Sequence, residues 1–229
     1  MISKLLIHLL VLDGKYLIMY QNKIEVVDMF DPRFKWTFPV RNKWLFSSEC
    51  SSKTQFATVI RDKILIFESH KYHIMGSPSI TKVMLKPKHG FAGVVIDNKE
   101  KLWIVGGSLF GDTVTKSSTE FITLDNDPTS GPDLPFNISG HKVIQVDENS
   151  IYIIGGNVNG SPSSRRTWIV NPKDNFKMKE GPKMNFSQSG FFGVAKMMID
   201  GQTLIVVASH DENVDILHPN KNKWVKGHY

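Results

Sequence analysis

Short apolar runs alternate with polar turns along the whole chain. The first run, at residues 5–12, ends at the turn signal Asp13-Gly14, and a second run follows at 16–20. Runs of about four to eight residues that are rich in Ile, Val, Leu and aromatics, and that end at Asp, Gly, Asn or Pro, are typical of β-strands joined by hairpins. Because no stretch has the period of a helix, the pattern predicts an all-β protein.

A double glycine at the end of an apolar run marks a repeat. The best-formed run, LWIVGG, ends in Gly106 and Gly107, and the same order returns 49 residues later as IYIIGG, with Gly155 and Gly156. Proline follows the third strand of every segment at intervals of about 47 residues, at Pro32, Pro87, Pro128, Pro172 and Pro219. A fixed period of this size predicts an array of similar units, here five.

The second segment departs from this pattern. Its strands are expected at 55–60, 64–67 and 80–85, and Glu68-Ser69 stands where the double glycine would be. One strand is therefore expected to be missing there. In the third segment the closing strand is expected at 131–135 and holds no tryptophan.

These repeats resemble the kelch repeat, a four-stranded blade of a β-propeller. The resemblance rests on LWIVGG and IYIIGG, on FDPRFKW at 30–36 and LHPNKNKW at 217–224, and on His89 and His141 at the start of two blades. It implies an all-β, kelch-type propeller of about five four-stranded antiparallel blades. The blades are expected at 1–46, 47–88, 89–137, 138–186 and 187–229 of a single domain. Kelch propellers usually close with six or seven blades, so the chain is either a five-bladed ring or a partial, open propeller.

The resemblance assigns structural roles to seven residues. The glycine pairs allow positive φ and close backbone approach, and an aromatic residue on the outer strand fills the wedge between blades. The structural glycines are Gly106, Gly107, Gly155 and Gly156, and the aromatics are Trp36, Phe176 and Trp224.

The composition is that of a globular protein with a basic surplus. The chain has 229 residues, 41% of them hydrophobic, and a formal net charge of +6. The surplus favours an acidic partner. Its 28 Lys and Arg are spread along the chain rather than concentrated beside aromatics, so nucleic-acid binding is not expected. No apolar run is long enough to span a bilayer, so no membrane association is expected.

The compartment is predicted from weak signals. Cys50 is the only cysteine, so no disulfide can form within the chain, which favours the cytoplasm. Secretion is the alternative. It would give meaning to the apolar start and to the glycosylation sequons at Asn137, Asn159 and Asn185.

No catalytic, metal or cofactor site is expected. His70 and His73 are read as a solvated loop without acidic neighbours, and Asp211, Glu212 and Asp215 as a charged hairpin tip. The glycine loops lead into strands rather than into a helix, which excludes a phosphate-binding loop. An enzyme with its site at a central channel is the alternative. Only His8, Gln145 and Lys196 interrupt the apolar inner strands, so the protein is not expected to be an enzyme.

The resemblance implies a protein-interaction module, with the partner bound by loops on one propeller face. Kelch propellers often serve as adaptors that present substrates to ubiquitin ligases, or bind actin. The loops that follow the glycine strands lie at 69–79, 108–118, 157–166 and 209–213. Their candidate partner-binding residues are Tyr72, Phe110, Asp112, Arg165 and Arg166, since arginine and exposed aromatics make typical interface anchors.

Overall fold

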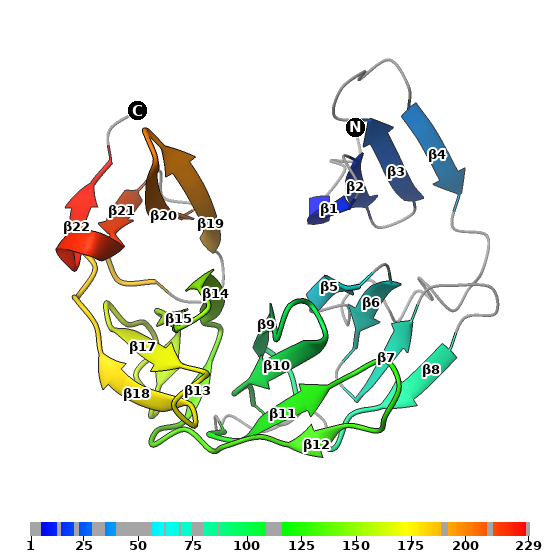
Figure 1. Cartoon of the computed structure of the whole chain (residues 1–229), viewed down its shortest axis with the longest axis horizontal. Helices are drawn as coiled ribbons and strands as arrows, with labels where there is room; N and C mark the ends of the chain where they lie inside the picture. The colour runs from blue at the N-terminus through cyan, green and yellow to red at the C-terminus, as the bar shows by residue number, and fades with distance from the viewer. Residues whose placement is uncertain are drawn as a thin grey trace. The chain divides into compact units, whose positions relative to one another are not determined.

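The structure is a computed structural model with an all-β architecture (Figure 1). It describes residues 6–12, 15–20, 23–28, 35–39, 56–61, 63–68, 70–74, 80–86, 88–108, 116–188, 192–209 and 213–227, and up to residue 56 it describes the backbone alone. The chain forms two compact units, Met1–Met84 and Leu85–Tyr229. The expectation of one domain with the five blade boundaries stays a prediction.

Two four-stranded antiparallel sheets make up the first unit, each with its strands in chain order. They are β1 Leu6–Leu12, β2 Lys15–Tyr20, β3 Lys23–Asp28 and β4 Lys35–Pro39, then β5 Phe56–Ile60, β6 Lys63–Phe67, β7 Lys71–Ile74 and β8 Ile80–Val83. The expectation of a missing strand was wrong, because β7 completes the second sheet and pairs with both β6 and β8. Its sequence KYHI has too few apolar residues to stand out as a strand.

Three four-stranded antiparallel sheets make up the second unit. They are β9 Ala92–Ile96, β10 Lys101–Val105, β11 Thr119–Ile122 and β12 Thr129–Ser130; β14 Lys142–Asp147, β15 Ser150–Ile154, β17 Thr167–Asn171 and β18 Lys177–Glu180; and β19 Phe192–Ile199, β20 Gln202–Ser209, β21 Val214–His218 and β22 Lys223–Lys226. The strand expected at 131–135 lies instead at β12. A small sheet pairs β13 Ile138–Ser139 with β16 Asn157–Val158, and a 3-10 turn, η1 Pro219–Lys221, joins β21 to β22.

The four-stranded sheets confirm the expected fold class. Each is a meander in which strands that follow one another within the sheet pair, and tight turns join several of these pairs. The β19–β20 turn is one example, because Asp200 and Gly201 both have positive φ, at 49° and 72°, as a primed turn demands. In the part of the chain that the structure describes, no helix is long and apolar enough to cross a membrane.

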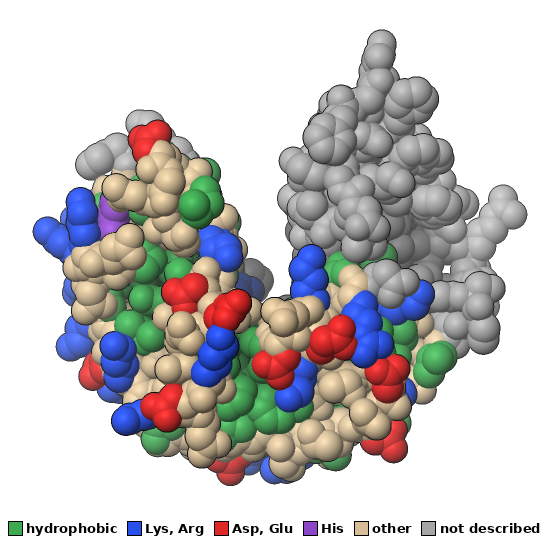
Figure 2. Space-filling model, in the orientation of Figure 1, with side chains coloured by type: hydrophobic (Ala, Val, Ile, Leu, Met, Phe, Trp, Pro, Cys, Tyr) green, Lys and Arg blue, Asp and Glu red, His purple; other side chains and the backbone are tan. Residues whose placement is uncertain are grey.

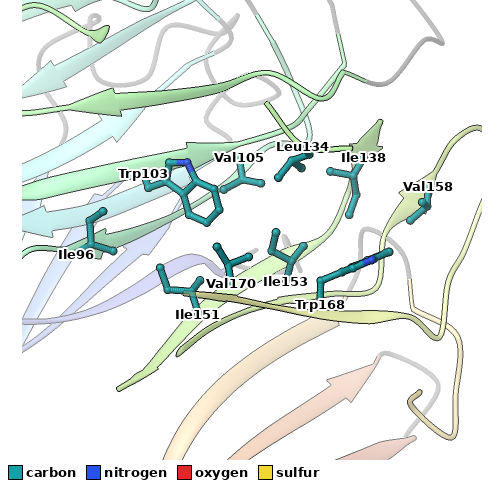
Figure 3. Close-up of a cluster of buried hydrophobic side chains, with 10 residues drawn as sticks. All are labelled: Ile96, Trp103, Val105, Leu134, Ile138, Ile151, Ile153, Val158, Trp168 and Val170. Atoms are coloured by element: carbon teal, nitrogen blue, oxygen red, sulfur yellow. The ribbon is translucent and has the colours of Figure 1, made fainter. Parts of the chain in front are cut away.

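The core of the second unit lies between neighbouring sheets. β14 lies against β9 on one side and against β19 on the other, so the first strands of the three sheets are side by side. Figure 3 shows the larger cluster, in which Trp103 and Val105 from one sheet face Ile153, Trp168 and Val170 from the next. A second cluster joins that sheet to the third one. Burial between stacked sheets is what a propeller blade needs, since one blade alone cannot cover its apolar face.

Aromatic residues near the outer strands fill these interfaces. The Phe176 ring lies 4.8 Å from the ring of Trp103 and 5.2 Å from that of Phe121, both in the preceding sheet. Trp224 is buried in the second cluster, and its Nε1 donates a hydrogen bond to the Pro182 carbonyl oxygen at 3.0 Å. Both aromatics therefore occupy the wedge between sheets. The side chain of Trp36 lies outside the described residues.

Candidate functional site

The sheets of the second unit have two ends of different character. We call the end at which β10 and β15 run into their glycine pairs the Gly-Gly end. We call the opposite end, at which the β9–β10, β14–β15 and β19–β20 hairpins turn, the turn end. The loops expected to bind a partner belong to the Gly-Gly end.

The glycine pairs fix each sheet to the next one. Gly106 and Gly107 have φ of 56° and 103°, and the Gly107 N–H donates to the Ile138 carbonyl at 2.7 Å. Gly155 and Gly156 have φ of 64° and 90°, and the Gly156 N–H donates to the Gln188 carbonyl at 2.7 Å. A Cβ on Gly106 would lie 2.5 Å from the Ile138 oxygen, so only glycine fits. Each glycine pair therefore ties its strand end to the connection that leads into the next sheet.

A second repeat supports this end, and the sequence reasoning missed it. The Thr119 hydroxyl donates to the Pro132 carbonyl at 2.8 Å, and the Thr167 hydroxyl donates to the Pro182 carbonyl. The signal was a second recurrence at nearly the same spacing as the glycine pairs, GPDLPFNISG at 131–140 and GPKMNFSQSG at 181–190. Each bond joins the first residue of a third strand, β11 or β17, to the segment that leads into the next sheet.

A pocket of about 330 Å³ opens at the Gly-Gly end of the first sheet of this unit. We call it the lysine pocket, because three lysines line it. Its lining residues are Lys86, Lys88, Lys116, Ser117, Ser118, Asp133 and Asn137. Lys116, Ser117 and Ser118 belong to one of the expected binding loops, whereas the other four come from the connections between sheets. Sequence reasoning missed those four because three separate segments bring the lining together.

A buried ion pair forms the floor of the lysine pocket. The side chains of Lys88 and Glu120 are each 1% exposed, and Lys88 Nζ lies 2.8 Å from Glu120 Oε1. The other carboxylate oxygen, Oε2, accepts the Leu85 N–H at 3.0 Å. Burial lowers the pKa of Lys88, the charge of Glu120 opposes this shift, and the charge of Lys86 adds to it. The pKa of Lys88 therefore lies below that of a free lysine, although the Glu120 carboxylate limits the shift.

The two arginines make contacts within the chain, although both are exposed. Arg165 Nε donates to the Met184 carbonyl at 2.6 Å. Arg166 Nε donates to Glu180 Oε1 at 3.2 Å, and its guanidinium lies 5.2 Å from the centre of the Trp168 ring. These contacts hold the guanidinium groups at the surface with donors still available, since each group has five.

The other three candidate residues are Tyr72, Phe110 and Asp112. The expectation that Tyr72 offers exposed aromatic area was wrong. Its side chain is fully buried in β7 and stacks on Phe67 at 5.1 Å between ring centroids. Phe110 and Asp112 lie outside the described residues.

The reading of His70 and His73 as a solvated loop was also wrong for His73. His73 is buried in β7, its Nε2 lies 3.3 Å from Glu68 Oε1, and its Nδ1 lies 3.0 Å from Thr81 Oγ1. An acidic neighbour is therefore present. This group holds one acid and one buried histidine, and no cluster of three metal-ligating side chains occurs in the ranges that the structure covers.

Asp215 does not belong to a charged hairpin tip, so that expectation was wrong. Its carboxylate is buried on β21 and accepts the Phe186 N–H at 3.0 Å and the Asn185 Nδ2–H at 2.6 Å. A glycan on Asn185 would replace a hydrogen of that amide. The residues 211 and 212 lie outside the described ranges, as does Cys50.

A larger cleft of about 520 Å³ lies at the turn end, and it brings together Gln145 and Lys196 from the inner strands. Its charged lining also includes Asp97, Lys99, Asp147, Glu148 and Lys173, all at or beside turns. A hydrogen bond and the charge of Lys173 lower the pKa of Glu148, and Lys196 Nζ donates to the Val146 carbonyl at 3.2 Å. Both signs of charge alternate here. Figure 2 shows the same mixture of blue and red side chains across one face of the sheets.

Comparisons with known proteins identify the fold. No protein-family model and no curated protein matches the sequence. Among solved structures, a catalytically inactive virginiamycin B lyase from Staphylococcus aureus, bound to quinupristin, aligns at 13% identity with a TM-score of 0.61. That alignment covers 99% of this chain and 73% of the lyase chain.

A second match is a chain of the S. cerevisiae complex of Dbp5 with Nup159, Gle1, IP6 and ADP, at 13% identity and a TM-score of 0.51. It covers 93% of this chain and 59% of that one, so the chain spans less than two thirds of the matched length. Identities this low carry the fold and not the family. Together with the five four-stranded sheets, they show that the chain has the β-propeller fold.

Proposed function

We propose that the chain is a non-catalytic, kelch-type interaction module that binds an acidic protein partner through the Gly-Gly end. The lysine pocket carries this proposal. It places Lys86, Lys88 and Lys116 around one concavity, and Asp133 is the only acidic residue among the described residues of its lining. Complementary charge raises association rates and selects partners.

The surroundings of the pocket support the same proposal. Arg165 and Arg166 extend the positive surface along the Gly-Gly end of the next sheet, with donors left for carboxylates. The turn end has alternating signs and lacks such a surplus among its described residues. One solved structure with this fold is a chain of a multiprotein complex, which agrees with a role in protein assembly.

The setting of this module follows from the resemblance to kelch repeats. We place it in the cytoplasm, as an adaptor that recognises substrates for a ubiquitin ligase or that joins a cytoskeletal assembly. The lack of any cysteine pair, with Cys50 the only cysteine, supports this setting over secretion. Expression through a secretory pathway tests the point: glycans on all three sequons would contradict it.

Partner capture by matched charge-reversal variants tests the proposal. The Gly-Gly-end variant carries Lys86→Glu and Arg165→Glu, and the control carries Lys177→Glu and Lys223→Glu at the turn end. All four side chains are exposed, and the two variants change the net charge equally. Affinity purification followed by mass spectrometry should lose an acidic partner with the first variant only. An unchanged partner set with the first variant, or an equal loss with the control, would contradict the proposal.

An enzyme with its site in the turn-end cleft is the second candidate. The observation that favours it is the meeting of Lys196, Gln145 and several carboxylates in one cleft of about 520 Å³. A lyase with this fold exists among the matched structures. If the first proposal is right, incubation of the protein with quinupristin, followed by mass spectrometry, should show no product. Turnover that Lys196→Met abolishes would establish the second candidate instead.

A further inference from the structure

The floor of the lysine pocket holds a lysine that has more hydrogen-bond donors than partners. Lys88 Nζ is buried and pairs with Glu120 Oε1 at 2.8 Å. An ammonium group has three donors. No other described residue accepts one of them. Buried donors that find no acceptor cost free energy, so the site favours an incoming anion with several acceptor oxygens.

The described lining of the pocket carries three lysines and one carboxylate. Glu120 balances one lysine from behind the floor. Lys86 is exposed and forms no ion pair with a described residue, and Lys116 lines the same space. Among the lining residues that the structure describes, the exposed Asp133 is the one carboxylate that an incoming anion would have to compete with.

The size and chemistry of the pocket narrow the choice of anion. A volume of about 330 Å³ holds a side chain with one charged group rather than a folded segment. Ser117, Ser118 and Asn137 add polar lining to the lysines. A carboxylate brings one charge and two oxygens, whereas a phosphate monoester brings about two charges and three strong acceptor oxygens. Three lysines around one concavity match the phosphate better.

We propose that the lysine pocket binds a phosphorylated Ser or Thr side chain of the partner. This inference rests on the proposed function and names the group that the partner presents. Lys86 and Lys116 then meet the phosphate from the rim, and the buried Lys88 acts on it through its charge from beneath the floor. Asp133 opposes binding, so the site has a built-in counter-charge whose removal strengthens it.

Paired peptide libraries provide the test. Random peptides with a fixed central Ser, phosphoserine or Asp are passed over the immobilised protein, with inorganic phosphate as competitor. The phosphoserine library should be retained at least about tenfold better than the other two, and inorganic phosphate should displace it. Lys86→Glu should abolish this preference, Asp133→Asn should increase it, and the control Lys177→Glu should leave it unchanged. Lys86 and Asp133 are exposed, so these variants keep the fold.

Two results would overturn the inference. One is equal retention of the phosphoserine and serine libraries, and the other is a preference that survives Lys86→Glu. Stronger retention of an RNA oligonucleotide or of phosphoinositide vesicles than of the phosphopeptides would also overturn it. If the Gly-Gly-end variant loses its acidic partner while the libraries show no phosphate preference, the proposed function stands and this inference alone fails.

Discussion

The Lys88–Glu120 pair should couple strongly, because burial removes the water that weakens ion pairs. At 2.8 Å, two unit charges attract by about 6 kcal/mol for an effective dielectric constant of about 20. Lys88→Met leaves the Glu120 carboxylate buried without a countercharge. Glu120→Gln leaves the Lys88 ammonium buried without one. Each change alone should lower the free energy of unfolding by about 3–5 kcal/mol.

The double variant separates pairing from burial. Lys88→Met with Glu120→Gln removes both charges and keeps an amide oxygen for the Leu85 N–H, so it should cost much less than the sum of the single changes. We expect a coupling of about 3 kcal/mol in a double-mutant cycle, measured by urea denaturation. Lys101 and Asp97 provide a matched control. Their nitrogen and oxygen lie 2.9 Å apart, but the side chains are 36% and 54% exposed, so their coupling should stay below about 1 kcal/mol.

If the stability losses of Lys88→Met and Glu120→Gln simply add in the double variant, the reasoning about the pocket floor is refuted. Coupling within about 0.5 kcal/mol of zero for Lys88 and Glu120 would mean that the pair is solvated or not formed. A coupling equal to that of the exposed pair would have the same meaning. In either case Lys88 would not be the fixed cation on which the phosphate inference depends.

Three further predictions concern the frame that supports the site. His141 is buried with neither ring nitrogen bonded to a described residue, and burial lowers its pKa from 6.5 to about 3. At acidic pH the unfolded chain therefore binds a proton at His141 that the folded chain does not bind. The free energy of unfolding should fall as the pH is lowered from about 6.5 to 3, with a loss of about 2 kcal/mol at pH 5. His141→Leu should remove this part of the pH dependence in urea titrations at several pH values. In thermal unfolding, Gly106→Ala should lower the stability by about 2 kcal/mol more than Gly160→Ala does. Both glycines have positive φ, but only the Cβ of the first alanine would meet an oxygen, at 2.5 Å. Equal losses of stability would contradict the close-approach argument. Trp224→Phe should lose about 1–2 kcal/mol in the same assay, since it removes the bond to the Pro182 carbonyl, and an unchanged melting temperature would mean that this bond contributes nothing.

The regular features of the blades could be predicted from the sequence because each one has a local cause. The glycine pairs announce positive φ, Asp200-Gly201 announces a tight turn, and the aromatics at Phe176 and Trp224 follow the repeat period. Each of these depends on a few neighbouring residues, so the pattern contains the information.

The features that could not be predicted depend on residues far apart in the chain. Burial of Tyr72 was missed for a different reason: its strand KYHI has no alternating apolar pattern, although Tyr72 stacks on Phe67 and pairs with β8. The lysine pocket combines Lys88, Lys116 and Asp133, which lie on three separate segments, and a charge on a turn has no periodic signature. Burial of Glu120 within a strand that reads TEFI is likewise a tertiary effect.

The affinity of a purified partner for three forms of the protein tests the central claim most directly. Calorimetric titration with wild type, with Lys86→Glu/Arg165→Glu and with Lys177→Glu/Lys223→Glu, at low and at physiological salt, gives the Kd for each form. Binding through the Gly-Gly end predicts that the first variant weakens affinity at least about tenfold and flattens the salt dependence, while the control stays within about twofold of wild type. Equal weakening by both variants, or unchanged affinity with the first, would contradict a partner site at the Gly-Gly end.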